Sequence, residues 1–260
     1  MHLVDSHSHL DFSEFDHDRP QAISRAIEAG VTDIIVSSTV ASRWQNVKNV
    51  ILENPSCCHA AYGLHPMFME QHGQSDLNAL KIWLENNDAV AVGEIGLDFF
   101  ITDQDQDSKN AQIELFVAQL QIATDFDLPV IIHARKSLDI VLKYLRKFPD
   151  LRGSIHSFSG SEQQAKQLID LGFYLGFGGP VTYNRATRLR KIIVKLPLYA
   201  LLLETDSPDQ PDALHHAQRN EPAYLVNIAT EIAHLRGIEL SELASATSEN
   251  AKKLFNIQDE

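Results

Sequence analysis

Short apolar segments alternate with longer amphipathic segments along this chain. The short segments are rich in Val, Ile and Leu, and they are Leu3–His9, Val31–Ser37, Cys58–Gly63, Ala89–Glu94, Pro129–His133, Gly153–His156, Phe173–Phe177 and Leu198–Thr205. Apolar runs of four to eight residues without strict alternation are typical of strands buried on both faces, as in parallel sheets. The pattern therefore predicts eight buried, parallel strands.

Helical periodicity fills most of the intervening segments. It is clearest in Asn110–Phe126, where apolar residues recur at three- and four-residue spacing and form one face. Glycines such as Gly30 and Gly172 follow predicted helices and supply stop signals. The other predicted helices are Arg19–Ala29, Trp44–Leu52, Leu77–Asn86, Leu138–Phe148, Glu162–Leu171, Thr187–Lys195, Ala223–Arg236 and Ser241–Phe255.

Alternation of this kind implies parallel strands joined by right-handed helical crossovers. Eight such units in 260 residues predict an α/β fold of the TIM (β/α)8 barrel type, with a single domain over residues 1–260. The alternative is an open, doubly wound sheet. No G-x-G-x-x-G follows the first strand to favour a dinucleotide-binding fold.

Residues that can bind metals follow several predicted strands. His7 and His9 lie two apart on the first strand, so both side chains point to the same side. In a TIM barrel the chemistry lies at the C-terminal ends of the strands. The candidates at those ends are His7, His9, His65, Glu94, His133, His156 and Asp206. Each alone has a structural explanation, but together they predict a metal site; the remaining histidines lack this placement.

Four histidines and two carboxylates exceed what one ion needs and suit two divalent metals. The hypothesis places one ion on His7, His9, Glu94 and Asp206, and the second on Glu94, His133 and His156. Glu94 bridges the ions, and Asp206 orients a metal-activated water and takes its proton, so these two carboxylates are the predicted catalytic residues. Histidine-rich ligand sets favour zinc, manganese or nickel, and the carboxylate bridge keeps magnesium open.

The composition and the net charge of the chain exclude several classes of protein. The formal net charge of −13 argues against a general nucleic-acid coat, so a nucleic-acid substrate would need a local basic rim or bound cations. No apolar run approaches the roughly 18 residues of a transmembrane helix, and no secretory signal is visible. We interpret the adjacent Cys57 and Cys58 as reduced thiols. These features predict a cytoplasmic protein with no membrane association and no obligate protein partner.

The chain resembles the TatD family of metal-dependent deoxyribonucleases, within the amidohydrolase-like barrels. The resemblance rests on motifs in order along nearly the whole chain: Asp5–Leu10 (DSHSHL), Gly63–Pro66 (GLHP), Gly93–Asp98 (GEIGLD), His133–Arg135 (HAR), His156–Gly160 (HSFSG), Glu204–Pro208 (ETDSP) and Arg219–Pro222 (RNEP). The family's metal ligands fall on His7, His9, Glu94, His133, His156 and Asp206, the set already reached from the strand ends.

The chain departs from the family pattern at two positions. Met67 stands where the family often has a second histidine, and Ser157 where it often has cysteine. Neither is a predicted ligand, although the first concerns substrate contact on the loop after His65. His65 and Arg135 are the predicted substrate-binding residues, with Arg135 placed to meet a phosphate.

Other motif residues have weaker assignments. Glu204 supports either a metal ligand or the Arg219 region, or is structural; residues 219–222 suggest a salt-bridged brace, and Asp98 a loop-ordering carboxylate. The basic stretch Arg185, Arg188, Arg190 and Lys191 is either a phosphate-binding rim or a charged helix face.

The leading hypothesis is a divalent-metal-dependent hydrolase that cleaves DNA phosphodiester bonds, on single strands or chain ends. Spacing alone indicates metal-assisted hydrolysis, and the DNase activity is what the resemblance implies. Two alternatives stay open. One is ester or amide hydrolysis, such as that of a D-aminoacyl-tRNA deacylase, an activity also associated with TatD-like proteins. The other is a metal-holding interaction module without turnover, against which the retained Asp206 argues.

Overall fold

The computed structural model describes residues 2–73, 75–101 and 105–258. Its strands form one eight-stranded sheet in sequence order from β1 to β8, and every neighbouring pair is parallel. The strands are β1 (Leu3–Ser8), β2 (Val31–Ser37), β3 (Cys58–Tyr62), β4 (Ala91–Asp98), β5 (Val130–Arg135), β6 (Gly153–Ile155), β7 (Phe173–Phe177) and β8 (Leu201–Leu203). Uninterrupted order confirms the predicted TIM barrel, because a doubly wound sheet reverses its order midway.

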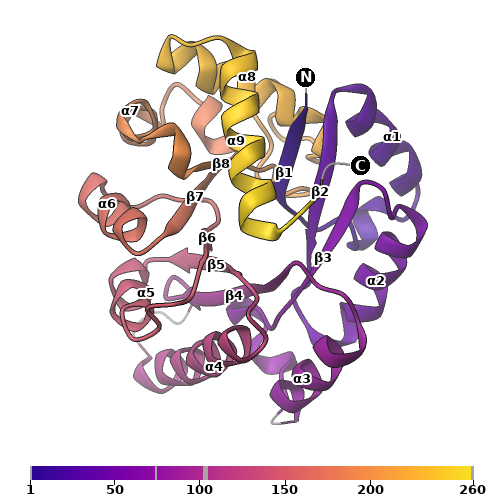
Figure 1. Cartoon of the computed structure of the whole chain (residues 1–260), viewed down its shortest axis with the longest axis vertical. Coiled ribbons are helices and arrows are strands. Elements are labelled where there is room, and N and C mark those ends of the chain that lie inside the picture. The colour runs from indigo at the N-terminus through magenta and orange to yellow at the C-terminus, as the bar shows by residue number, and fades with distance from the viewer. Residues whose placement is uncertain (1, 74, 102–104, 259–260) are drawn as a thin grey trace.

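Helices lie around the strands (Figure 1). They are α1 (Arg19–Glu28), α2 (Trp44–Glu53), α3 (Asp76–Asn86), α4 (Gln106–Asp125), α5 (Leu138–Leu145), α6 (Glu162–Asp170), α7 (Thr187–Lys195), α8 (Leu225–Arg236) and α9 (Leu240–Phe255). Of these, α1 to α7 each connect two successive strands, and α8 and α9 follow β8. Short 3-10 helices add η1 (Ser13–Phe15), η2 (Ala41–Arg43), η3 (Pro66–Gln71), η4 (Gly179–Thr182), η5 (Leu198–Ala200) and η6 (Pro222–Tyr224).

Contacts between β1 and the segment after β8 bring the sheet close to full closure. Ser8 and Ser207 form a parallel bridge. The His9 backbone N–H donates to the Ser207 carbonyl at 2.7 Å, and the Asp206 N–H donates to the His7 carbonyl at 2.9 Å. These bonds place candidate ligands from the two ends of the chain beside one another.

Apolar side chains form two layers. On β2, Ile34 and Val36 pack outward into the larger core between barrel and helices, whereas Ile35 belongs to a smaller cluster. This alternation is the period of two expected of a strand. The smaller cluster fills the barrel interior and includes Val4, Ala61, Ala91, Ile131 and Leu202.

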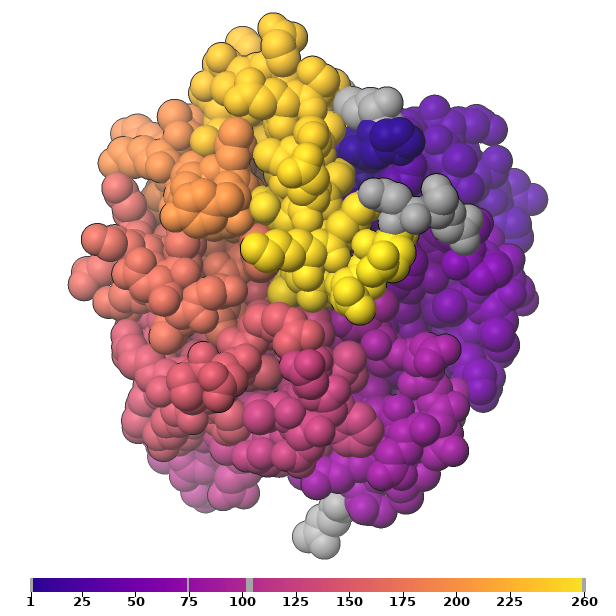
Figure 2. Space-filling view, in the orientation of Figure 1, coloured from indigo at the N-terminus to yellow at the C-terminus, as the bar shows by residue number. Residues whose placement is uncertain are grey.

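Helix α9 closes one end of this interior. Its Ala251, Leu254 and Phe255 join the inner cluster, and the Ser248 hydroxyl donates to the His2 carbonyl at 2.9 Å. In Figure 1 α9 crosses in front of the strands, and Figure 2 shows its atoms, in yellow, covering the centre of that face. Because His2 precedes β1, this is the N-terminal end of the barrel, and the C-terminal ends of the strands are left for the site.

Gly176 on β7 leaves room for the buried side chain of Glu204. A Cβ on Gly176 would lie 2.1 Å from Glu204 Oε2, which no real contact allows. We expect Gly176→Ala to destabilise the protein by about 1–3 kcal/mol through overpacking. The midpoint of thermal unfolding would measure this loss of stability. Gly73→Ala is the control, because the nearest atom to a Cβ there lies 3.7 Å away, an ordinary van der Waals contact. Equal midpoints for both variants would contradict the expectation.

The element bounds differ from the predictions at several ends. The predicted strand Leu198–Thr205 is wrong at its start, where Leu198–Ala200 forms η5 and the strand covers only Leu201–Leu203. A short apolar run does not distinguish strand from helix, and Pro197 fixes the backbone just before it. The fourth strand extends beyond Glu94 to Asp98, and the helix predicted from Asn110 already begins at Gln106. Within the described residues, no helix is long and apolar enough to cross a membrane.

Candidate metal centre

One half of the site gathers donors from β1, β4 and the segment after β8. The Nε2 atoms of His7 and His9 lie 3.2 Å apart. Glu94 Oε2 lies 3.2 Å from His7 Nε2 and 3.3 Å from His9 Nε2. Asp206 Oδ1 lies 3.4 and 3.6 Å from the same two nitrogens. Four donor atoms thus converge on one point.

The other oxygen of Glu94 faces a second set of imidazoles. Glu94 Oε1 lies 3.1 Å from His133 Nδ1, 3.0 Å from His156 Nε2 and 3.0 Å from His65 Nε2. His133 Nδ1 and His156 Nε2 are 3.3 Å apart. The structure therefore brings all six predicted ligands together, and His65 with them, around one carboxylate that is 1% exposed.

These separations fit ligands that share a cation. Nitrogen and oxygen donors about 2.0–2.1 Å from a tetrahedral zinc are roughly 3.3 Å from one another. His7, His9 and Glu94 form one group able to hold an ion, His65, Glu94 and His133 a second, and His7, His156 and Asp206 a third. The donor set thus suits divalent metals, in keeping with the prediction.

Hydrogen-bond acceptors at the outer nitrogens orient two of the predicted histidine ligands, His9 and His133. His9 Nδ1 lies 2.8 Å from the Ser37 carbonyl, and His133 Nε2 lies 3.0 Å from Asp98 Oδ2. A neutral imidazole carries one proton, which such acceptors hold on the outer nitrogen. The inner lone pair is then free to bind a metal, an arrangement that metal-ligating histidines usually have.

His65 has the opposite arrangement. The Met67 backbone N–H donates to His65 Nδ1 at 3.0 Å, so this nitrogen carries a lone pair and the proton of the neutral ring lies on Nε2. Nε2 is the atom that faces Glu94 Oε1, and it therefore donates to that carboxylate. Burial lowers the pKa of His65 to about 4, in agreement with a neutral ring. His65 therefore donates a hydrogen bond through Nε2, and this atom offers no free lone pair to a metal.

The charges of the cluster are strongly coupled. Burial alone would raise the pKa of Glu94, but the surrounding imidazoles hold it well below its ordinary value. Burial would likewise raise the pKa of Asp206, and His156 and His7 hold it low. Burial disfavours protonated His9 and His156, yet the facing carboxylates raise the pKa of both well above the usual value.

These pKa shifts predict that metal affinity depends on pH. Protons and metal ions compete for the same nitrogen lone pairs of His9 and His156, while the low pKa of Glu94 and Asp206 keeps both carboxylates ionised. We expect affinity for zinc or manganese to rise between pH 6 and pH 8, by roughly tenfold per pH unit for each proton displaced. Competition with a coloured chelator would measure it. An affinity constant over that range would contradict the expected proton displacement.

The roles predicted from the sequence for Asp98 and for residues 219–222 are confirmed by the structure. The role of Glu204 had been left undecided. Asp98 Oδ1 accepts from the backbone N–H of Phe100 at 2.9 Å, which confirms the loop-ordering role, but its contact with His133 was missed. Arg219 pairs with Asp18 and Glu221, which confirms the brace. Glu204 lies beneath the site, 3.5 Å from His156 Nδ1, and accepts from the Ser157 N–H.

Cationic side chains lie beside the second half of the site. Arg135 is the last residue of β5 and Lys136 follows it. The Arg135 guanidinium lies 3.8 Å and the Lys136 ammonium 4.6 Å from the ring centre of the exposed Phe100. Lys136 and Arg188 also line one pocket, together with Ser159. Within the predicted basic stretch, Arg188 thus lines this pocket, whereas the Arg190 guanidinium pairs with the Glu231 carboxylate at 2.7 Å.

Parallel barrels that carry imidazole and carboxylate donors at the C-terminal ends of their strands are suited to metal-assisted hydrolysis. Fold and site together therefore define the class of the protein as a metal-dependent hydrolase. The family model described as TatD related DNase matches residues 4–256. The chain belongs to this family, as the sequence motifs predicted.

Individual relatives agree with this assignment. An uncharacterized metal-dependent hydrolase of Escherichia coli K12, YjjV, is 40% identical over 258 residues, covering 98% of each chain. The crystal structure of the E. coli YjjV protein, a TatD homologue, superposes with a TM-score of 0.92 at 39% identity and 98% coverage of both chains. The protein named 3'-5' ssDNA/RNA exonuclease TatD of Citrobacter koseri is 34% identical over 265 residues, covering 98% of this chain and 99% of the relative.

Proposed function

We propose that this protein is a nuclease that hydrolyses DNA phosphodiester bonds, on single strands or chain ends, with two divalent metal ions. The observation that carries the proposal is the placement of Glu94: Oε2 faces His7 and His9, while Oε1 faces His133 and His156. A carboxylate whose two oxygens face separate donor sets is the bridge that a two-metal site requires.

The proposed ligands divide between two ions. His7, His9, Glu94 and Asp206 would hold one, and Glu94, His133 and His156 would hold the other. His65 would donate a hydrogen bond to Glu94 through Nε2, and its predicted contact with substrate stays part of this proposal. Bound there, the cations would polarise a phosphoryl oxygen and make a water more acidic.

Asp206 is the proposed proton acceptor. Its Oδ1 faces His7 and His9, and its Oδ2 accepts from the side-chain amide of Gln210, so the carboxylate is held in one orientation. A water bound at the mouth would meet Asp206 at a fixed position, and its proton would pass to the carboxylate as the oxygen attacks. Glu94 holds the donor atoms of the two halves of the site in position relative to one another.

The cations beside the mouth supply the contact with substrate phosphates. In a chain of net charge −13, a polyanion needs local positive charge to approach. Arg135, Lys136 and Arg188 provide it at one side of the site, and Arg135 can bind a phosphate through two parallel N–H donors. The exonuclease name of the Citrobacter koseri relative also favours nucleic acid as substrate.

A panel assay tests the proposal. Metal-reconstituted protein is offered single-stranded DNA, duplex DNA, aminoacyl-tRNA and simple esters, and DNA cleavage is expected to dominate. Preferential release of the amino acid from D-aminoacyl-tRNA would replace the nuclease with the ester-hydrolase alternative. No turnover on any substrate by the fully metallated protein would favour a metal-holding interaction module.

Charge reversal provides a sharper prediction. Arg135→Glu and Arg188→Glu are each expected to lower kcat/KM on DNA by about tenfold or more, because each places a negative charge where a phosphate binds. Lys166→Glu, on the exposed face of α6, is the matched control for net charge. Initial rates at low salt are the measurement. If all three variants lose activity equally, general electrostatics rather than a phosphate contact would be responsible.

A further inference from the structure

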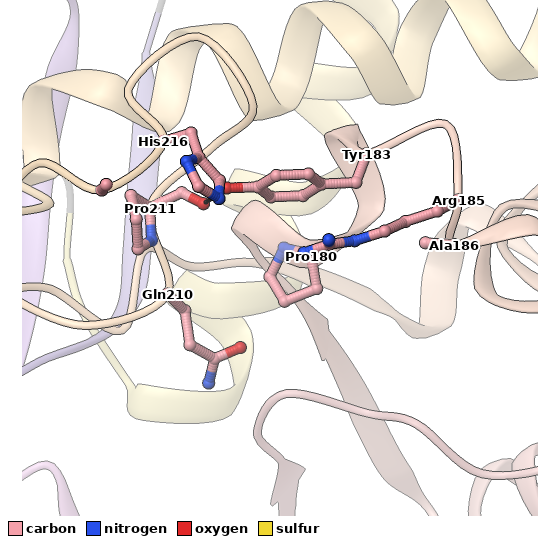
Figure 3. Close-up of a pocket in the computed structure, with 8 residues that line it drawn as sticks. Pro180, Tyr183, Arg185, Ala186, Gln210, Pro211 and His216 are labelled. Atoms are coloured by element: carbon pink, nitrogen blue, oxygen red, sulfur yellow. Dashed lines mark hydrogen bonds between the residues drawn. The ribbon is translucent and has the colours of Figure 1, made fainter.

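A second pocket lies between the segment after β7 and the segment after β8. It has a volume of about 620 Å³ and is lined by Pro180, Tyr183, Arg185, Ala186, Gln210, Pro211, His216 and Ala217. Figure 3 shows the side chains of Tyr183, Arg185 and His216 grouped at one end of the pocket and Gln210 at the other. The metal hypothesis uses neither the aromatic side chains nor Arg185.

Tyr183 is the fixed element of this pocket. Its hydroxyl donates to the carbonyls of Pro211 at 3.0 Å and Asp212 at 3.1 Å, so the ring ties the two segments together. The Thr182 hydroxyl adds a second tie by accepting from the Ala213 N–H at 2.8 Å. The orientation of the phenol ring is thus set before any ligand arrives, which reduces the entropy lost on binding.

Two exposed planar groups accompany the Tyr183 ring. The Arg185 guanidinium lies over it at 4.9 Å from the ring centre, and the His216 imidazole meets it edge-on at 5.9 Å. Arg185 and His216 are both exposed to solvent. Aromatic rings with an arginine plane form the stacking platforms on which proteins bind single-stranded nucleic acid, since every base has a flat π-face.

Gln210 connects the pocket to the metal centre. Its side-chain nitrogen donates to Asp206 Oδ2, and its Oε1 accepts from the Ser157 hydroxyl at 2.9 Å. Because Gln210 lines the pocket and donates to Asp206, a group bound in the pocket would be one side chain away from a proposed metal ligand. Arg188, two residues beyond Ala186, lines a separate pocket together with Lys136.

We propose that the pocket formed by Tyr183, Arg185 and His216 binds the base of the nucleotide adjacent to the hydrolysed phosphate. The inference rests on the proposed nuclease function and adds a recognition site to it. The base stacks on the planar groups whatever its identity. The Arg185 guanidinium balances the charge of the neighbouring phosphate. A strand then runs from this pocket, past Asp206, to the cationic side at Lys136 and Arg188.

The test compares a single-stranded oligonucleotide with one whose terminal nucleotides lack their bases. For the unaltered protein, kcat/KM is expected to be at least about tenfold higher on the oligonucleotide with bases. Tyr183→Leu and Arg185→Ala should each shrink that ratio toward one. A variant that only loosens the loops would lower both rates equally and leave the ratio unchanged, which would overturn the proposal. Tyr199→Leu is the control, because Tyr199 is 68% exposed on η5, at the start of β8 and outside the pocket.

A second measurement separates this inference from the nuclease proposal. Deoxyadenosine monophosphate and deoxyribose 5-phosphate are compared as inhibitors of the hydrolysis of bis(4-nitrophenyl) phosphate, a simple phosphodiester. Tighter inhibition by the nucleotide, weakened about tenfold by Tyr183→Leu, supports base binding even if DNA is not cleaved. Equal inhibition by both compounds, alongside efficient DNA cleavage, would reject the base pocket and leave the nuclease proposal intact.

Discussion

Replacing Glu94 by glutamine is expected to remove metal from the protein and abolish hydrolysis of every substrate. The amide keeps the shape of the side chain but offers one oxygen instead of two, and it lacks the charge that faces five imidazoles. Loss of residues that merely support a ligand lowers metal affinity about 10–100-fold, so loss of a bridging ligand should exceed that range. Elemental analysis after dialysis, together with activity, is the measurement.

The control for this variant is Glu85→Gln, which makes the same chemical change at an exposed position on α3. It should retain the metal content and the activity of the unaltered protein. Circular dichroism would establish that the Glu94→Gln protein is folded. A folded Glu94→Gln protein with full metal content at unchanged affinity would refute the proposed bridge.

Asp206→Asn is expected to lower kcat by about 10²–10⁴-fold, the range usual for loss of a general base. An asparagine cannot accept the proton of the attacking water, yet its oxygen still faces His7 and His9. Metal binding should therefore weaken but persist at saturating metal, because the other donors of that half remain. Rates at saturating metal and substrate separate the chemical defect from a binding defect.

Asp209→Asn serves as the matched control, since Asp209 is an exposed carboxylate three positions further along the same loop. It should turn over at nearly the rate of the unaltered protein. If Asp206→Asn recovers full activity when metal is raised, the carboxylate is only a ligand and the proton must pass to another group.

The fold was predictable because the buried strands are short apolar runs and the helices between them are amphipathic. Helix Glu162–Asp170 begins at a capping box, with Ser161 and Gln164 bonding reciprocally, and such signals are readable from the sequence. The start of β8 was not predictable, since Leu198–Ala200 is as apolar as the strand that follows. The role of α9 in closing the interior was also invisible, because its apolar stripe does not reveal which surface it contacts.

The sequence predicted which residues form the site but not how their protons and hydrogen bonds are arranged. Strand ends identify which side chains reach the mouth, and this alone assembled the cluster around Glu94. They do not reveal proton positions: the donor character of His65 depends on the Met67 N–H, a backbone contact without a motif. The pocket around Tyr183 was missed for a similar reason, since it is formed by two loops joined through backbone carbonyls far apart in sequence.

The position of α9 has a consequence for synthesis of the protein. The segment that seals the barrel interior, Leu240–Phe255, leaves the ribosome after all eight strands of the described barrel. Until α9 emerges, the apolar side chains of Val4, Ile35 and Leu202 inside the barrel stay exposed at that end. The strands β1 and β2 that carry two of them are synthesised long before. The nascent barrel therefore exposes this apolar surface until α9 has been synthesised, and until then it is prone to aggregate.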